Sequence, residues 1–188
     1  MSQQDLLRYV VEMLDRAGIE YMITGSIASS LQGEPRSTHD LDVVVALRGE
    51  DAPALMAAFP PPRFYVSEEA VREAIGAKGM FNVIEVEEGD KVDFWLLTEE
   101  PFDRARFRRR IEVEVFGIRL KVSSPEDTIL AKLRWSKMSG GSEKAFVDAV
   151  RIYEVQGAAL DQAYLEEWVG QLGVADLWER LKAEAEAV

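Results

Sequence analysis

Two carboxylates separated by one residue, Asp40 and Asp42, open the apolar run DLDVVVAL (40–47). The β-branched residues predict a strand over 39–47, and side chains two positions apart in a strand point to the same face of a sheet. Two like charges on one face repel each other unless a cation neutralises them. Because magnesium is commonly held by one or two carboxylates and the phosphates of a substrate, the pair indicates a metal–nucleotide site.

A Gly-Ser step lies upstream of these acids, between a short buried strand predicted over 19–23 and the first turns of a helix. Gly25 allows a ligand to approach the backbone closely, because glycine has no side chain. The amides that open a helix favour a phosphate, and Ser26 adds a hydroxyl group. We therefore expect Gly25 and Ser26 to bind the phosphates of a nucleoside triphosphate.

The composition restricts the chemistry further. The chain has no cysteine and one histidine, His39. Disulfides, thiolate zinc sites and cysteine nucleophiles are therefore excluded, and a histidine-based zinc site is disfavoured. A metal site in this chain must be rich in oxygen ligands, which suits Mg²⁺ or Mn²⁺. His39 faces away from the acids on the predicted strand, and we interpret it as structural.

The net charge of −12 argues against nonspecific coating of nucleic acid or anionic membrane. The N-terminal segment lacks the features of a signal peptide, and no apolar run has membrane-spanning length. These patterns predict a cytoplasmic protein with no membrane partner. Five arginines between Arg104 and Arg110 form a local basic cluster. We interpret it as a solvated segment that balances the glutamates rather than as a site for tRNA or another polyanion.

The fold class predicted is α+β, with a mixed α/β core over 1–122 and a helical C-terminal region over 123–188. Gly89-Asp90 and Gly117 each mark a hairpin turn between two predicted strands. Caps, prolines and apolar periodicity predict the helices. They cover 2–17, a segment from Asp51 that ends before Pro60, and 67–75, 125–138, 142–156, 161–171 and 174–186.

The arrangement resembles the nucleotidyltransferase superfamily of the DNA polymerase β type. Its signature is an apolar residue, Gly-Ser, a spacer, and Asp-x-Asp between apolar residues. Here Gly25-Ser26 and Asp40-Leu41-Asp42 match with thirteen residues (27–39) between them, although Thr24 replaces the apolar residue. The resemblance implies a mixed sheet with flanking helices and a third carboxylate on a later strand. Asp93, within KVDFWLL (91–97), is the best match, because a charge among apolar strand residues needs a reason.

The same resemblance implies catalysis by Asp40, Asp42 and Asp93 as the ligands of Mg²⁺ or Mn²⁺. A nucleoside monophosphate would pass from a nucleoside triphosphate to a hydroxyl acceptor. More narrowly, PRSTHDLDV (35–43) and SPEDTILAKL (124–133) are similar to the branch that contains AbiEii-type toxins. That branch implies a toxin of a toxin–antitoxin pair, with an antitoxin as partner.

Three further residues are candidates for nucleotide binding. Arg36 lies in the loop before the acids and is either a phosphate ligand or an exposed arginine. Thr38 shares strand parity with Asp40 and Asp42. Lys132 either faces the triphosphate or extends its amine to solvent.

The sequence leaves two other functional classes open. A noncatalytic nucleotide-binding or interaction protein would keep the fold without releasing pyrophosphate, since fold does not imply function. A glycosyltransferase would use Asp-x-Asp for a nucleotide-sugar, but it leaves the Gly-Ser step unexplained. The sequence does not identify the acceptor, which is a small molecule, RNA or protein, nor does it identify the base of the nucleotide.

Overall fold

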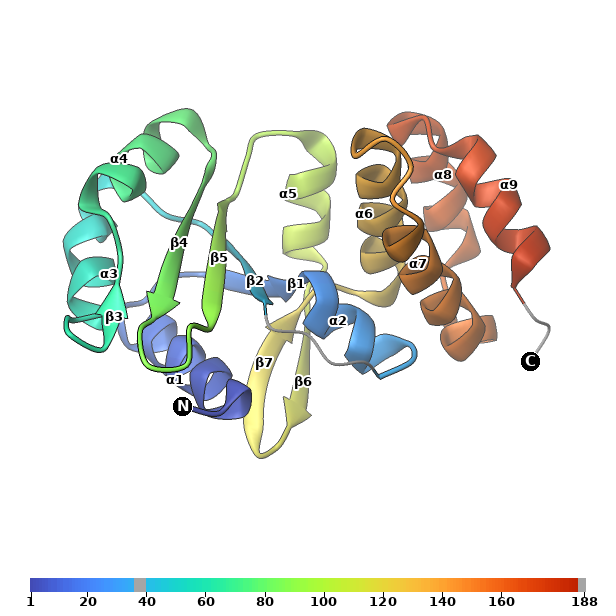
Figure 1. Cartoon of the computed structure of the whole chain (residues 1–188). Helices are drawn as coiled ribbons and strands as arrows, with labels where there is room; N and C mark the ends of the chain where they lie inside the picture. The colour runs from blue at the N-terminus through green and yellow to red at the C-terminus, as the bar shows by residue number, and fades with distance from the viewer. Residues whose placement is uncertain (36–39, 186–188) are drawn as a thin grey trace. The chain divides into compact units, whose positions relative to one another are not determined.

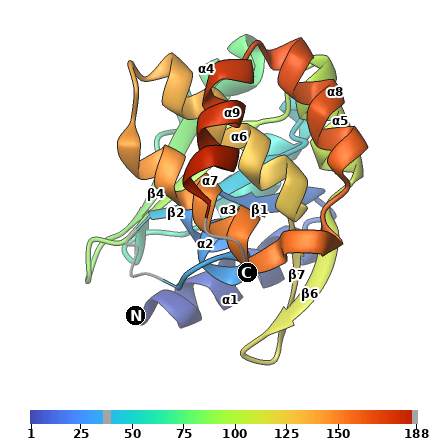
Figure 2. The same cartoon turned by 90° about the vertical axis from the view of Figure 1, so that its right-hand side faces the viewer.

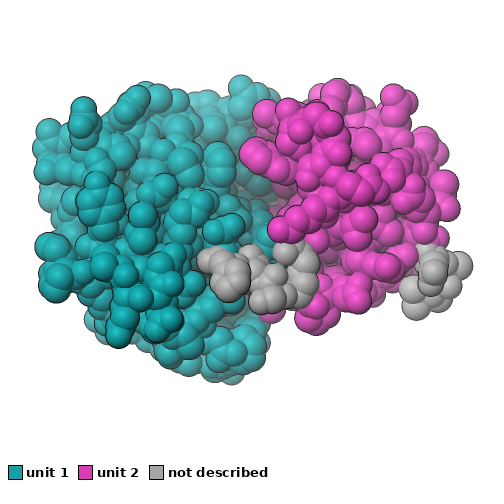
Figure 3. Space-filling view, in the orientation of Figure 1, with its two compact units in different colours: residues 1–26, 38–122 teal, residues 27–37, 123–188 magenta. Residues whose placement is uncertain are grey.

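The structure, a computed structural model, describes residues 1–35 and 40–185. The chain divides into two compact units (Figure 3). Unit 1 comprises residues 1–26 and 38–122, and unit 2 comprises residues 27–37 and 123–188. Unit 1 contains a mixed sheet with helices, and the described part of unit 2 is helical. The α+β prediction is therefore confirmed.

Within the described residues, unit 1 holds a seven-stranded sheet with the order β3-β4-β5-β2-β1-β7-β6 (Figure 1). Strand β2 is parallel to β5, and β1 is parallel to β7, whereas the other neighbouring pairs are antiparallel. The strands are β1 (Tyr21–Thr24), β2 (Asp40–Val45), β3 (Phe64–Tyr65), β4 (Met80–Glu85), β5 (Lys91–Leu96), β6 (Ile111–Val115) and β7 (Ile118–Val122).

One face of this sheet carries the apolar core of unit 1. Phe94 on β5 is fully buried and its ring stacks on Phe81 of β4, with 5.1 Å between the ring centroids. Phe59, at the end of α3 (Ala52–Ala58), meets Phe94 edge-on with 5.8 Å between the ring centroids. The ring of Tyr9 lies 6.0 Å from that of Phe59. Burial of such aromatic surface is a large favourable contribution to folding. The helices of this part are α1 (Gln3–Arg16), η1 (Gly49–Asp51), α3 (Ala52–Ala58) and α4 (Glu68–Ala77).

Helix α5 (Pro101–Arg108) packs against the sheet as well, and the sequence patterns did not predict it. Its C-terminal Phe107 forms a buried cluster with Met22, Val44 and Leu97. The helix lies within the arginine-rich segment, whose charge obscures the apolar periodicity. Arginines of this segment form ion pairs with acids, which agrees with their interpretation as balancing charges. The pairs are Arg104–Glu99, Arg106–Asp103 and Arg110–Glu20.

Unit 2 is built from helices that follow β7 (Figure 2), together with residues 27–32 of α2 (Gly25–Gln32). The segment that resembles the AbiEii branch begins α6, where Ser124 caps the helix and accepts a hydrogen bond from the Asp127 amide. Asp127 is fully buried and accepts a 2.7 Å hydrogen bond from the Tyr164 hydroxyl. In this structure these residues therefore cap and pack helices. The helices are α6 (Pro125–Met138), α7 (Glu143–Gln156), η2 (Gly157–Ala159), α8 (Gln162–Leu172) and α9 (Ala175–Glu184).

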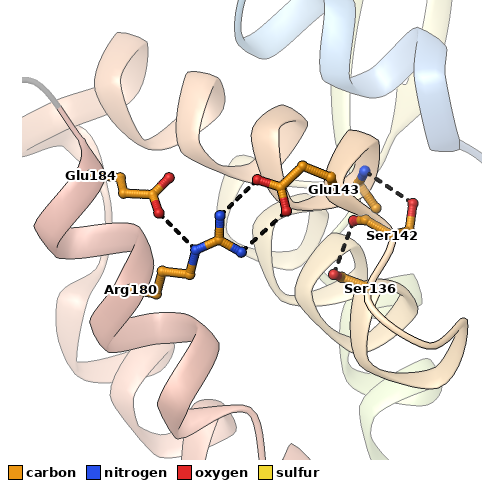
Figure 4. A network of polar contacts seen from close by, with 6 residues as sticks. Ser136, Ser142, Glu143, Arg180 and Glu184 are labelled. Carbon is orange, nitrogen blue, oxygen red and sulfur yellow. Dashed lines mark hydrogen bonds and ion pairs between the residues drawn. The ribbon is translucent and has the colours of Figure 1, made fainter.

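A polar network joins α7 to α9 within unit 2 (Figure 4). Arg180 donates to both carboxylate oxygens of Glu143, at 2.6 and 3.2 Å, and to Glu184 at 2.7 Å. These hydrogen bonds raise the pKa of Arg180 further above its ordinary value. The Ser136 hydroxyl donates to the carbonyl of Ser142, which caps α7. Because the ion pairs are exposed, they contribute more to the geometry of the two helices than to stability.

No helix among the described residues has both the length and the apolar character needed to cross a membrane.

The β6–β7 hairpin supplies a test of the fold. Its two turn residues, Phe116 and Gly117, both have positive φ, 52° and 68°, as a type I′ turn requires. Asparagine tolerates this conformation better than phenylalanine, and the Phe116 side chain is 62% exposed. We expect Phe116→Asn to raise the free energy of unfolding by about 0.5–1 kcal/mol, measured by urea denaturation. Phe116→Val should lower it, and equal stability of both variants would contradict the turn geometry.

Candidate functional site

The predicted acids of unit 1 are brought together by the parallel pairing of β2 with β5. In this register Asp42 lies opposite Asp93, and Asp40 lies opposite Lys91. On the other side of β2, Thr24 at the end of β1 lies opposite Asp42. Partners in register share a face of the sheet, so the three carboxylates project from the face opposite the aromatic core.

Asp42 is held against the backbone of Gly25. Gly25 has φ +64°, and a Cβ atom there would lie 2.0 Å from Oδ2 of Asp42. Only glycine therefore fits both the backbone conformation and the neighbouring carboxylate. The indole Nε1 of Trp95 donates to the other oxygen of Asp42 at 3.2 Å. The two contacts fix the orientation of the Asp42 carboxylate.

Asp93 is the buried member of the group, with 7% of its surface exposed. Lys91 Nζ lies 2.9 Å from its Oδ2. Its Oδ1 is buried and has no hydrogen-bond partner. A buried carboxylate oxygen without a partner is costly in a folded protein, so its position calls for a ligand or a functional reason.

In the protein without ligands, the ammonium group of Lys91 partly neutralises the negative charge of these acids. Its hydrogen bond to Asp93 raises the pKa of Lys91 above the ordinary value, and burial opposes this effect only in part. The negative charges of Asp93, Asp40 and Asp42 act in the same direction as the hydrogen bond. The ammonium group is therefore firmly charged and lies within the field of all three carboxylates.

The described residues contain no group of three or more His, Cys, Asp or Glu side chains already arranged to hold a metal ion. The donors that β2 and β5 bring together are nevertheless carboxylate oxygens, the ligands that Mg²⁺ and Mn²⁺ prefer. The Oδ1 atom of Asp93, which has no hydrogen-bond partner, also fits a role as a metal ligand. Binding of a metal by Asp40, Asp42 and Asp93 stays a prediction.

Three further predicted nucleotide ligands, Arg36, Thr38 and Lys132, stay predictions. Arg36 and Thr38, like His39, lie outside the described residues. Lys132 belongs to unit 2, where its Nζ lies 2.7 Å from Oδ2 of Asp148. The side chains of this ion pair are only 14% and 9% exposed, and the pair joins α6 to α7.

The structure adds residues that the sequence analysis missed. Lys91 and Trp95 flank Asp93 at two-residue spacing on β5, and both contact the acids. Asn82 on β4 lies opposite Asp93 in register and is exposed. The alternation of KVDFWLL carried this signal, because residues 91, 93 and 95 share one face of a strand.

Comparison with known proteins identifies the fold. A family model described as aminoglycoside-2''-adenylyltransferase matches residues 6–75, which include Gly25, Asp40 and Asp42. A solution structure of the antibiotic-resistance factor ANT(2'')-Ia has a TM-score of 0.59 and 18% identity, covering 96% of this chain and 94% of that one. The chain has the nucleotidyltransferase fold.

Two further nucleotidyltransferase structures are similar. A crystal structure of ANT(2'')-Ia in complex with adenylyl-2''-tobramycin has a TM-score of 0.57 and 15% identity, covering 96% of this chain and 99% of that one. The lincomycin-bound lincosamide antibiotic adenylyltransferase LnuA has a TM-score of 0.56 and 9% identity, covering 82% and 98%. No curated protein sequence matches the chain. The superfamily resemblance is supported, whereas the AbiEii-like branch stays a prediction.

Gly25 and Gly89 form a matched pair for testing the contact with Asp42. Both have positive φ, but a Cβ atom at Gly89 would meet nothing within 4 Å. We expect Gly89→Ala to cost about 1 kcal/mol for the backbone alone. Gly25→Ala should cost about 1–3 kcal/mol more, because the new methyl group displaces Asp42. Urea denaturation measures both, and equal losses would show that Asp42 does not depend on Gly25.

Lys132 is tested by a double-mutant cycle. Lys132→Met removes the ammonium group from the nearly buried Asp148, and we expect a loss of about 2–3 kcal/mol in the free energy of unfolding. Lys132→Met/Asp148→Leu should recover most of that loss, since it removes both charges. Unchanged stability of Lys132→Met, with weaker nucleotide binding, would instead support the predicted role of Lys132 at the phosphates.

Proposed function

We propose that this chain is a metal-dependent nucleotidyltransferase that transfers AMP from ATP to a hydroxyl group of a small molecule. The observation that carries the proposal is the position of Asp42, which lies against Gly25 and opposite Asp93. In this arrangement the Gly25-Ser26 segment, which we propose binds the phosphates, lies next to the carboxylates. The family match over residues 6–75 and the fold of the antibiotic adenylyltransferases support the same conclusion.

Each residue of the group has a role in this proposal. The backbone at Gly25 and Ser26 binds the phosphates at the start of α2. Asp40, Asp42 and Asp93 hold Mg²⁺ or Mn²⁺, which when bound neutralises charge on the triphosphate and on the departing pyrophosphate. Trp95 keeps Asp42 in its orientation through the hydrogen bond to Oδ1.

The reaction is a substitution at the α-phosphorus of ATP. The acceptor oxygen forms a bond to this phosphorus, and the bond to pyrophosphate breaks. The acceptor proton must leave at the same time, and we assign as its base the carboxylate oxygen of Asp93 that does not bind the metal. A positioned base contributes typically 10²–10⁴-fold to such a step.

For the acceptor we favour a cationic molecule rich in hydroxyl groups, of the aminoglycoside class. The matching family model carries the aminoglycoside-2''-adenylyltransferase description, and one similar structure contains adenylyl-2''-tobramycin. The net charge of −12 supports this choice independently, because an acidic protein attracts polycations and repels RNA.

A second candidate is a noncatalytic nucleotide-binding protein, and the Lys91–Asp93 ion pair favours it. In that case the ammonium group replaces a metal ion permanently, and the carboxylates remain from a catalytic ancestor. The toxin–antitoxin interpretation stays a prediction of the narrower resemblance. Growth arrest on expression, relieved by Asp40→Ala, would support it.

Pyrophosphate release tests the proposal. We expect release from ATP with Mg²⁺ and an aminoglycoside panel, and a loss of at least about 100-fold in Asp42→Asn. Asparagine is nearly isosteric and keeps an acceptor for Trp95, so stability should change by less than about 1 kcal/mol. Glu114→Gln removes one charge from the exposed Glu114 on β6 and is the control, with unchanged activity.

Calorimetry with each nucleoside triphosphate and Mg²⁺ separates the two candidates. Binding that Asp42→Asn abolishes, together with product formation, supports the transferase. Binding without pyrophosphate release for any aminoglycoside, lincosamide or RNA acceptor would favour the noncatalytic protein.

A further inference from the structure

Lys91 is a lysine that lies among the three carboxylates of the candidate site. It begins β5, lies opposite Asp40 in the β2–β5 register, and contacts Asp93 at 2.9 Å. Its side chain is 38% exposed, so the ammonium group reaches both the buried Asp93 and solvent. The cation therefore stands among the carboxylates that the proposed function assigns to the metal.

A positive charge at this position has two opposite effects. It repels a divalent ion that approaches Asp40 and Asp93, and at a separation of a few ångströms this repulsion is substantial even with strong screening. It attracts a triphosphate, whose negative charge is larger than that of Asp93. A lysine side chain has a flexible four-carbon stem, so its ammonium group can exchange one anionic partner for the other.

We propose that Lys91 couples metal binding to nucleotide binding. In the protein alone Lys91 holds Asp93 and disfavours a free metal ion. When the metal arrives with a nucleoside triphosphate, Lys91 transfers its ion pair from Asp93 to a phosphate and leaves Asp93 available to the metal. Lys91 is thus a positioning residue that makes the metal–nucleotide complex, and not the free metal, the preferred ligand. The inference rests on the proposed metal site of Asp40, Asp42 and Asp93.

The geometry of Asp93 supports this exchange. One of its oxygens is engaged by Lys91, and the other is buried with no hydrogen-bond partner. A purely structural ion pair would normally satisfy both oxygens of a buried carboxylate. The half-satisfied state is instead suited to a carboxylate whose partner changes.

The experiment measures Mn²⁺ affinity by electron paramagnetic resonance on the full chain, without nucleotide and with saturating α,β-methylene-ATP. In Lys91→Met we expect free Mn²⁺ to bind about tenfold more tightly and the nucleotide to enhance Mn²⁺ binding far less than in the unchanged protein. Lys91→Gln serves as a second neutral variant, and Lys91→Arg should restore the coupling. Because coupling between two ligands is reciprocal, the affinity for the ATP analogue should show the same change.

Lys121→Met is the matched control. Lys121 is also a partly exposed strand lysine of unit 1, and it lies near Asp15 and Glu20, at 3.9 and 3.8 Å. Its removal changes the net charge equally and should leave the coupling unchanged.

Two results would overturn the inference in distinguishable ways. If the neutral Lys91 variants bind free Mn²⁺ as the unchanged protein does, while Asp42→Asn abolishes Mn²⁺–nucleotide binding, the metal site stands and the role of Lys91 is wrong. If the unchanged protein binds no Mn²⁺ even with the nucleotide analogue, the metal site fails and the inference fails with it.

Discussion

The parallel pairing of β2 with β5 is the constraint on which the site depends. It sets Asp42 beside Asp93 and Asp40 beside Lys91 on one face of the sheet. A shift of one residue in either strand would move its charged side chains into the aromatic core around Phe94. The burial of that core therefore fixes the register of the two strands, and the register sets the positions of the carboxylates.

Several residues of the site have a backbone conformation or a burial that is unusual for their type. Gly25 has a left-handed backbone, and the Asp42 carboxylate fills the space that a side chain would need. Asp93 is a buried acid in an apolar strand, with one oxygen that lacks a partner. Such departures cost stability, and natural proteins retain them mainly where function requires them. Their meeting at one pair of carboxylates is the arrangement that we expect of a site for binding or chemistry.

The sequence predicted the parts of this arrangement that are encoded locally. Alternation placed Asp40 and Asp42 on one face, and the Gly-Ser step marked the start of α2. The pairing of β2 with β5 is nonlocal, so the contact of Trp95 with Asp42 could not be predicted from either strand alone. The Lys91–Asp93 pair lies within β5, where the alternation of the strand already carried its signal. Helix α5 was missed because arginines that pair with acids masked its apolar residues. The ion pair of Lys132 is also nonlocal, since its partner Asp148 lies on another helix.

Lys91 in unit 1 and Lys132 in unit 2 each pair with a carboxylate, but the surroundings of the two pairs differ. Lys132 meets Asp148 in a pair that is nearly closed to solvent on both sides, as expected of a contact that fixes two helices. Lys91 meets Asp93 with its own side chain 38% exposed, and it faces two further carboxylates. A cation that is accessible and surrounded by excess negative charge is poorly explained by stability alone, because one carboxylate would suffice to pair it. This surplus of acids is the reason that we propose a further positive group here, a divalent ion that arrives with a triphosphate.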